Sequence, residues 1–191
     1  MRCILCESFS FAHICSTCQE TFLTPSIYRR KILNATEVIS FYKYSDIKEL
    51  LLTKHTDLGF YIYKILAKNS LKIFANEFEF GHTVASIAVD DHAKNGYSHT
   101  AVLNQALKCK IIKPYANKLR DKNRISYAGK SREFRLLHPR DFEFKGFREE
   151  DVLLVDDIIT TGLTFTHALN TMQKNNKNVL FCLALADANL K

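Results

Sequence analysis

The chain lacks the segments that would place it in or across a membrane. Its 191 residues contain no apolar run that approaches the roughly 20 residues of a membrane-spanning helix. No apolar stretch follows Met1-Arg2-Cys3, as a secretory signal peptide would require. Low-complexity tracts and evident repeats are also missing. We therefore expect a soluble, intracellular protein that does not span a membrane.

The composition is that of an ordinary globular protein with an excess of positive charge. Hydrophobic residues make up 47% and charged residues 25% of the chain, which is long enough for one domain and a small module. Lys and Arg number 27 against 20 Asp and Glu, a net charge of +7. Such a balance suits an anionic partner, but on charge alone generic solubility is the better explanation.

The most informative stretch is residues 152–164, Val-Leu-Leu-Val-Asp-Asp-Ile-Ile-Thr-Thr-Gly-Leu-Thr. Four apolar residues without alternation predict a strand that is buried on both faces. Two acids, Asp156 and Asp157, follow at its carboxyl end, where open α/β sheets bind ligands. A helix is predicted next, because apolar residues recur at helical spacing, at Phe165, Ala168, Leu169 and Met172.

Between the acids and this helix lies a loop suited to a phosphate. Backbone N–H groups at a helix N-terminus are unpaired, and the helix dipole favours an anion there. Gly162 permits a positive φ or a close backbone approach, and Thr160, Thr161 and Thr164 offer hydroxyl donors. Because acids repel phosphates, the two carboxylates should face neutral hydroxyls or a magnesium-bound group from the solvent-facing tip of the strand. The stretch therefore predicts a sugar-phosphate site, with a simple helix N-cap as the alternative.

Residues 152–164 resemble the phosphoribosyl pyrophosphate (PRPP) motif of type I phosphoribosyltransferases. That motif has four apolar residues, two acids, two apolar or small residues and then Thr-Thr/Ser-Gly-x-Thr, and every position matches here. The resemblance implies that Asp156 and Asp157 hold the ribose hydroxyls, and that magnesium accompanies PRPP. It assigns the 5′-phosphate to the loop and helix start, at Thr160, Thr161, Gly162 and Thr164.

The N-terminus carries two C-x2-C pairs, Cys3 with Cys6 and Cys15 with Cys18. Two such knuckles can place four thiolates around one structural zinc ion. Disulfides are the alternative, and an intracellular setting argues against them. Pro25 and the basic run that begins at Tyr28 mark a boundary, so we divide the chain into a zinc module at 1–30 and a second domain at 31–191.

The second domain alternates strand and helix patterns. We predict strands at 36–44, 83–89, 152–155 and 179–186, and helices at 46–52, at 58–78 and from Ser98 onward. Four buried strands with helices between them predict an α/β fold with a doubly wound, mostly parallel sheet. The same fold is implied by the resemblance to type I phosphoribosyltransferases.

Residues 108–140, called the basic segment below, hold eleven Lys and Arg against Asp121 and Glu133, a net +9. Basic residues with interleaved aromatics can bind single-stranded nucleic acid, because cations pair with phosphates and rings stack on bases. We assign this role to Lys118, Arg120, Lys122 and Arg124. A solvated lid over the PRPP site is the alternative.

Paired cysteines before a phosphoribosyltransferase-like domain resemble the ComF family of bacterial competence proteins, the ComFC type, over nearly the whole chain. Lys54-His55 matches a lysine-rich turn of the family. Residues 95–99 stand where the family usually has Arg-Gly-Phe-Asn-Gln, of which Gly96 and an aromatic, Tyr97, are kept. The resemblance implies handling of imported single-stranded DNA during natural transformation. It places the protein in the cytoplasm, at the inner face of the membrane, beside a helicase-like ATPase.

Three functions follow, and the sequence leaves open whether the chain is an enzyme. It can be a PRPP-dependent transferase, in which Lys54 helps to hold pyrophosphate, unless Lys54 is a solvated lysine at a helix end. It can instead be a nucleic-acid-handling protein that keeps PRPP binding. A conventional nucleobase-salvage enzyme is less favoured, because we can assign no nucleobase pocket and the cysteine module takes the place of the usual N-terminal hood.

Overall fold

A six-stranded sheet forms the centre of the computed structural model, which describes residues 1–33, 35–89, 96–122, 133, 137 and 140–190. The strand order is β1-β2-β8-β7-β3-β4. Only β1 runs antiparallel to its neighbour, so the predicted mostly parallel α/β sheet is confirmed. The strands are β1 (Tyr28–Ile32), β2 (Thr36–Lys43), β3 (Val84–Ala88), β4 (Ile112–Tyr115), β7 (Asp151–Ile159) and β8 (Asn178–Asp187).

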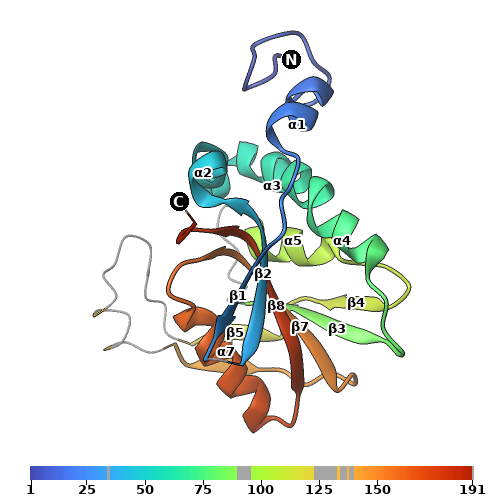
Figure 1. Cartoon of the computed structure of the whole chain (residues 1–191), viewed down its shortest axis with the longest axis vertical. Helices are drawn as coiled ribbons and strands as arrows, with labels where there is room; N and C mark the ends of the chain where they lie inside the picture. The colour runs from blue at the N-terminus through green and yellow to red at the C-terminus, as the bar shows by residue number, and fades with distance from the viewer. Residues whose placement is uncertain (34, 90–95, 123–132, 134–136, 138–139, 191) are drawn as a thin grey trace.

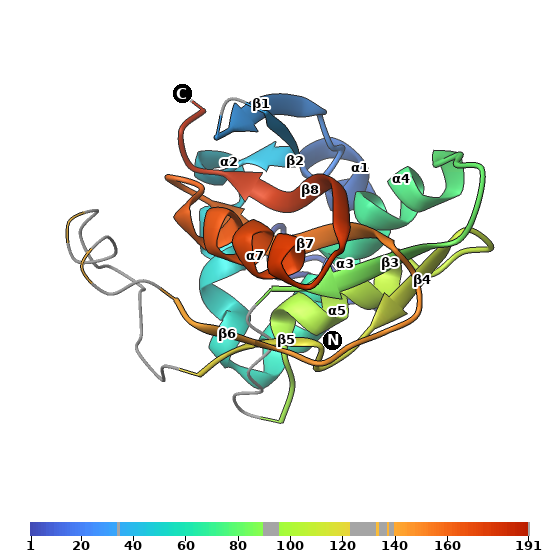
Figure 2. The same ribbon diagram turned by 90° about the horizontal axis from the view of Figure 1, so that it is seen from below.

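Helices cover both faces of this sheet (Figures 1 and 2). One face packs against α2 (Tyr44–Leu52), α3 (Asp57–Asn69), α4 (Leu71–Glu77) and α5 (His99–Ala106). The other packs against α7 (Leu163–Lys174) and a small hairpin of β5 (Leu119–Asp121) and β6 (Phe142–Phe144). Among the described helices, none is both long and apolar enough to cross a membrane.

Strand β7 shows why the motif begins with an unbroken apolar run. Leu153 and Val155 join the core on the α3 side, while Val152 and Leu154 join the core on the α7 side. All four are fully buried, because successive strand residues point to opposite faces and both faces are covered. The apolar residues predicted for the following helix are also buried, at Phe165, Ala168, Leu169 and Met172 of α7.

Two local predictions were wrong. The helix predicted over 58–78 is divided at Ser70, whose backbone leaves the helical region and whose hydroxyl bonds the Leu66 carbonyl. Strand β7 continues through both acids to Ile159, because β8 is long enough to pair with it as far as Asp187. Asp156 and Asp157 therefore lie within the sheet ladder, and not at its solvent-facing tip.

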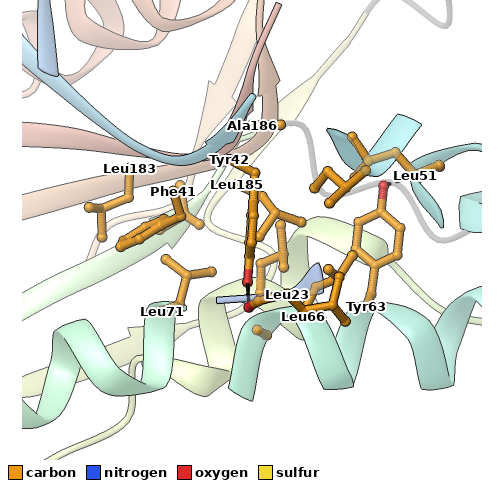
Figure 3. Close-up of a cluster of buried hydrophobic side chains, with 14 of the residues drawn as sticks. Leu23, Phe41, Tyr42, Leu51, Tyr63, Leu66, Leu71, Leu183, Leu185 and Ala186 are labelled. Atoms are coloured by element: carbon orange, nitrogen blue, oxygen red, sulfur yellow. Dashed lines mark hydrogen bonds between the residues drawn. The ribbon is translucent and has the colours of Figure 1, made fainter. Parts of the chain in front are cut away.

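The N-terminal module packs onto the helical layer (Figure 1). It holds α1 (Ser16–Phe22), and four of its residues belong to the same hydrophobic core as the α3 side of the sheet: Cys3, Ile14, Cys18 and Leu23. Figure 3 shows Leu23 beside Tyr42 of β2, whose hydroxyl donates to the Leu23 carbonyl over 2.8 Å. The module is thus held against the helical layer by apolar packing and by the hydrogen bond from Tyr42.

Candidate functional site

Asp157 collects three donors from three separate elements onto one oxygen. The Lys54 Nζ lies 2.9 Å from its Oδ2, the Tyr63 hydroxyl 3.3 Å and the His99 Nε2 3.4 Å. The Asp157 side chain is only 9% exposed. Although burial raises the pKa of Asp157, the charges of Lys54 and His99 outweigh this effect and lower the pKa.

Asp156 has the opposite environment. It is half-buried, and its Oδ1 accepts a bond of 2.8 Å from the backbone N–H of Asp157. Burial and the neighbouring charge of Asp157 raise its pKa well above the ordinary value, against a smaller opposing effect of Arg140. The two adjacent carboxyls therefore differ in acidity: the pKa of Asp157 is lowered and that of Asp156 is raised.

The loop after β7 makes a tight left-handed turn into α7. Gly162 adopts φ +81°, in the left-handed region, and directly precedes the first turn of α7. A Cβ at this position would lie 2.7 Å from the Ile32 side chain, so the backbone approach depends on glycine. Thr160, Thr161 and Thr164 surround this turn, with Thr161 exposed and the other two half-buried. The predicted cradle residues are therefore brought together next to the acids.

Residues far away in the sequence brace this loop. Arg30 of β1 donates to the Thr160 carbonyl over 2.5 Å and forms an ion pair of 3.0 Å with Asp187. Asn189 donates to the same carbonyl over 3.1 Å. The sequence reading missed Arg30, Asp187 and Asn189, because no local pattern shows that β1 and the end of β8 lie beside the loop.

Lys54 is held in the site and is not a solvated lysine at a helix end. It lies in the short 3-10 turn η1 (Thr53–His55) between α2 and α3, and its side chain is 23% exposed. His99, at the start of α5, and Tyr63, on α3, complete the set around Asp157. The sequence predicted a site role for neither residue, since no local pattern shows that the fold brings them to Asp157.

The four cysteines of the N-terminal module form one cluster. Their sulfur atoms all lie within 4.8 Å of one another, and Cys6 and Cys15 are 3.7 Å apart. Four sulfurs at about 2.3 Å from a zinc ion would be about 3.8 Å apart in a tetrahedron, so the arrangement fits such an ion. All four are free thiols, so the alternative of disulfides is not what the structure shows.

The thiols also differ in acidity. Burial raises the pKa of Cys3, but backbone hydrogen bonds from Cys15, Cys6 and Leu5 outweigh it and lower the pKa to about 6. Burial and the adjacent thiols raise the pKa of Cys18. Several thiolates this close repel one another unless a cation lies between them, which is the chemistry of a metal-binding cysteine cluster.

The described part of the basic segment is dispersed by the fold, and Lys130, Arg132 and Arg135 lie outside it. Lys118 bonds the Gly146 carbonyl over 2.8 Å, and Lys122 pairs with Asp141 at 2.9 Å, both within the β5–β6 hairpin. Arg120 is half-buried in the same hairpin, and Arg140 pairs with the buried Asp121. Arg124 lies outside the described residues.

Three further lysines of the segment lie elsewhere, at the amino edge of the sheet. A hollow of about 920 Å³ is found there, opposite the edge that holds the acids. Its lining includes the cations Lys108, Lys110, Lys113 and Arg148 and the acids Glu149 and Glu150. This hollow is therefore separate from the predicted ligand site.

The sequence matches no protein-family model and no curated protein. Among solved structures the chain is similar to several phosphoribosyltransferases. For a hypoxanthine phosphoribosyltransferase from Staphylococcus aureus the identity is 15%, the aligned part covers 65% of this chain and 62% of that one, and the TM-score is 0.43. The chain thus spans less than two thirds of that protein.

Two others are covered more completely. For orotate phosphoribosyltransferase from Aeropyrum pernix the identity is 16%, the coverage 90% and 80%, and the TM-score 0.41. Adenine phosphoribosyltransferase from Saccharomyces cerevisiae was solved with adenine and an imino-altritol bisphosphate. Its identity to this chain is 16%, the aligned part covers 90% of this chain and 88% of that one, and the TM-score is 0.40. At these identities and TM-scores the likeness carries no argument about activity, and the fold assignment rests on the strand order.

Proposed function

We propose that this chain is a phosphoribosyltransferase-like protein that binds PRPP at the carboxyl edge of its sheet. The observation that carries the proposal is the juxtaposition of an acid pair, Asp156 and Asp157, with a left-handed Gly162 at a helix start and with the ammonium of Lys54. PRPP has a phosphate, a diol and a pyrophosphate, and each of these three groups finds a matching element here.

The chemistry of each element fits one group of the ligand. Backbone N–H groups and threonine hydroxyls at residues 160–164 would donate to the 5′-phosphate, and such charge-assisted bonds contribute roughly 1.5–3 kcal/mol each. Asp157, kept ionised by Lys54, would accept from a ribose hydroxyl, and Asp156 would bind the other. Lys54 would then face the pyrophosphate, which magnesium accompanies as part of the substrate.

Group transfer from PRPP would ask for positioning and charge more than for a strong acid or base. The pyrophosphate leaves with the bonding electron pair, and the positive charge that develops on the ribose is stabilised by the surrounding carboxylates. Pyrophosphate release from PRPP, measured with free nucleobases and with single-stranded DNA as acceptors, separates a transferase from a protein that only binds PRPP.

Binding itself is tested by calorimetry with magnesium PRPP on the wild type and on Asp156→Ala/Asp157→Ala. We expect at least a hundredfold loss of affinity, because two charge-assisted contacts disappear. Since Asp157 also holds Lys54 and His99, the Ala variant should lose stability, so Asp156→Asn/Asp157→Asn serves as the matched variant that keeps the side-chain volume. Wild-type affinity in a folded Asn variant would remove the basis for this function.

A role in handling single-stranded DNA is our second proposal, in line with the resemblance to the ComF family. It would place the chain in the cytoplasm, at the inner face of the membrane and next to a helicase-like ATPase. The observation that favours an anionic polymer is the cation-lined hollow at the amino edge, with Lys108, Lys110, Lys113 and Arg148. Conventional nucleobase salvage is the alternative, and the acceptor assay above distinguishes the two. We assign the four cysteines to a structural zinc ion.

A further inference from the structure

The turn that carries Lys54 depends on contacts from outside itself. The 3-10 turn η1 (Thr53–His55) and its C-cap Thr56, together called the Lys54 turn below, lie between α2 and α3. Short 3-10 turns have poor internal hydrogen-bond geometry and are held by their surroundings. Within the turn, the Thr56 hydroxyl donates to the Thr53 carbonyl and accepts from the Gly59 N–H, which joins the turn to the start of α3.

Tyr97 closes the other side of the turn. Its hydroxyl donates to the Lys54 carbonyl over 2.7 Å and lies 3.3 Å from the Thr56 carbonyl, so one phenol reaches two carbonyls of the same turn. Its ring meets Phe60 of α3 edge to face, with centroids 5.7 Å apart. Hydroxyl and ring thus fix the turn relative to α3.

Tyr97 is itself fixed from behind. It directly precedes Ser98, which caps α5 by accepting from the Ala101 N–H over 3.1 Å. Helix α5 is tied to the sheet by Asn104, whose amide donates to the carbonyls of Ser86 and Tyr115. Tyr97 is therefore anchored to β3 and β4 through α5. His99, two residues after Tyr97, contacts Asp157 directly.

Gly59 allows this close approach. A Cβ on Gly59 would collide with the Thr53 carbonyl oxygen and with the Tyr97 hydroxyl. Only glycine lets α3 start this close to both the turn and the phenol. Gly59 and Tyr97 together thus fix the Lys54 turn against α3. Ligand sites need this kind of support, because the residues that contact the ligand must be held in place by their neighbours.

We propose that Tyr97 is a positioning residue for the ligand site. Through the Lys54 carbonyl it sets the backbone of the Lys54 turn, so that the ammonium reaches Asp157 and the pyrophosphate of bound PRPP. This inference rests on the proposed PRPP binding. Tyr97 would not touch the ligand, and its effect would be transmitted through Lys54 alone.

The test uses two ligands that differ in the group that Lys54 would face. Magnesium PRPP carries the pyrophosphate and ribose 5-phosphate does not. Tyr97→Phe keeps the ring on Phe60 and removes the hydroxyl, and we expect PRPP affinity to fall about tenfold with less than about a twofold change for ribose 5-phosphate. Lys54→Met should show the same selectivity with a larger loss, up to about a hundredfold.

The double variant decides whether Tyr97 acts through Lys54. In the Lys54→Met background, Tyr97→Phe should change PRPP affinity by less than about twofold. The effects of two substitutions on affinity do not add when one residue acts only through the other. Tyr61→Phe is the matched control: its half-exposed ring also contacts Phe60, and it should leave both affinities unchanged. Gly59→Ala, which crowds the same turn, should reproduce the selective loss.

Four results would contradict the inference or its premise. Equal weakening of both ligands by Tyr97→Phe, in protein that is fully folded by circular dichroism, would show a general structural role. Full additivity with Lys54→Met would show that Tyr97 acts elsewhere. If the wild type binds neither ligand, the proposed function fails first and the positioning role fails with it. Wild-type binding of PRPP with an unaffected Tyr97→Phe variant overturns the positioning role alone.

Discussion

The PRPP-like motif at residues 152–164 and the basic segment at residues 108–140 are both distinctive in sequence, but the fold treats them differently. In the motif, strand, loop and helix follow one another, and the acids and the cradle lie together. The basic segment is split, as far as the structure describes it: Lys108, Lys110 and Lys113 line the amino edge, while Lys118 and Lys122 bond within a hairpin.

This difference reflects what each pattern encodes. A strand that runs into a helix fixes its own loop, because the β7 ladder and the first turn of α7 constrain both ends within a few residues. A run of cations encodes no geometry, and each lysine takes whatever carbonyl or carboxylate the fold brings to it. A motif with fixed local spacing therefore predicts a three-dimensional site better than a high density of charged residues does.

The four-cysteine spacing is a second local motif and gives the largest test of this view. Purified protein should hold one zinc ion per chain by plasma mass spectrometry, and Cys3→Ser/Cys6→Ser should release it, since structural zinc contributes apparent binding energies of about 10–16 kcal/mol. Because Cys3 and Cys18 belong to the shared core, metal loss should lower the melting temperature of the whole chain and expose residues 1–25 to protease. Stoichiometric disulfides without metal, in protein purified without oxygen, would refute the assignment.

Gly162→Val tests whether the cradle depends on its glycine. The substitution places a branched side chain at φ +81° and against Ile32, so we expect PRPP affinity to fall by about a hundredfold and stability by about 1–3 kcal/mol. Gly146→Val, in the loop after β6, is the control, because a Cβ there meets no atom within 4 Å. Comparable losses in both variants would mean that valine itself, and not the cradle, is responsible.

Charge reversals probe the basic segment. We expect Lys108→Glu/Lys110→Glu to flatten the salt dependence of binding to an oligothymidine more than Lys118→Glu/Lys122→Glu, because the second pair is already bonded within the hairpin. Each lost phosphate contact should reduce the slope of log K against log salt by about 0.7. If the hairpin pair has the larger effect, the nucleic-acid surface lies on the hairpin; unchanged slopes in both would leave DNA binding without support.

The smallest expected effect concerns pH. The folded pKa of Asp157 is lowered, so its pairing stabilises the fold above the ordinary value of about 3.9, and that contribution is lost as the pH falls. The pKa of Asp156 is raised, so its contribution to stability increases as the pH falls. Lys54, His99 and Tyr63 face Asp157. Denaturant unfolding between pH 5 and pH 3 should therefore show a shallower loss for Asp157→Asn than for the wild type. Identical slopes would show that the ion pair contributes nothing to stability.

The sequence alone determined the features that depend on neighbours along the chain. The buried run of β7, the helix that follows it and the closeness of four cysteines each follow from spacing within about 20 residues. Fold class followed for the same reason, since alternating buried strands and helices can be covered on both faces in few ways.

Only the tertiary structure decided the contacts that join distant segments. Lys54 reaches Asp157 across 103 positions, and Arg30 reaches Thr160 across 130. It also placed the acids inside the ladder, because the length of β8, and not the motif, sets how far β7 is paired. Isolated residues such as Tyr63 carry no periodic or spacing signal, and the family resemblance at residues 95–99 gave no role to His99 or Tyr97. Their roles arise from the parallel order of the strands, which brings the ends of segments far apart in the sequence to one edge of the sheet.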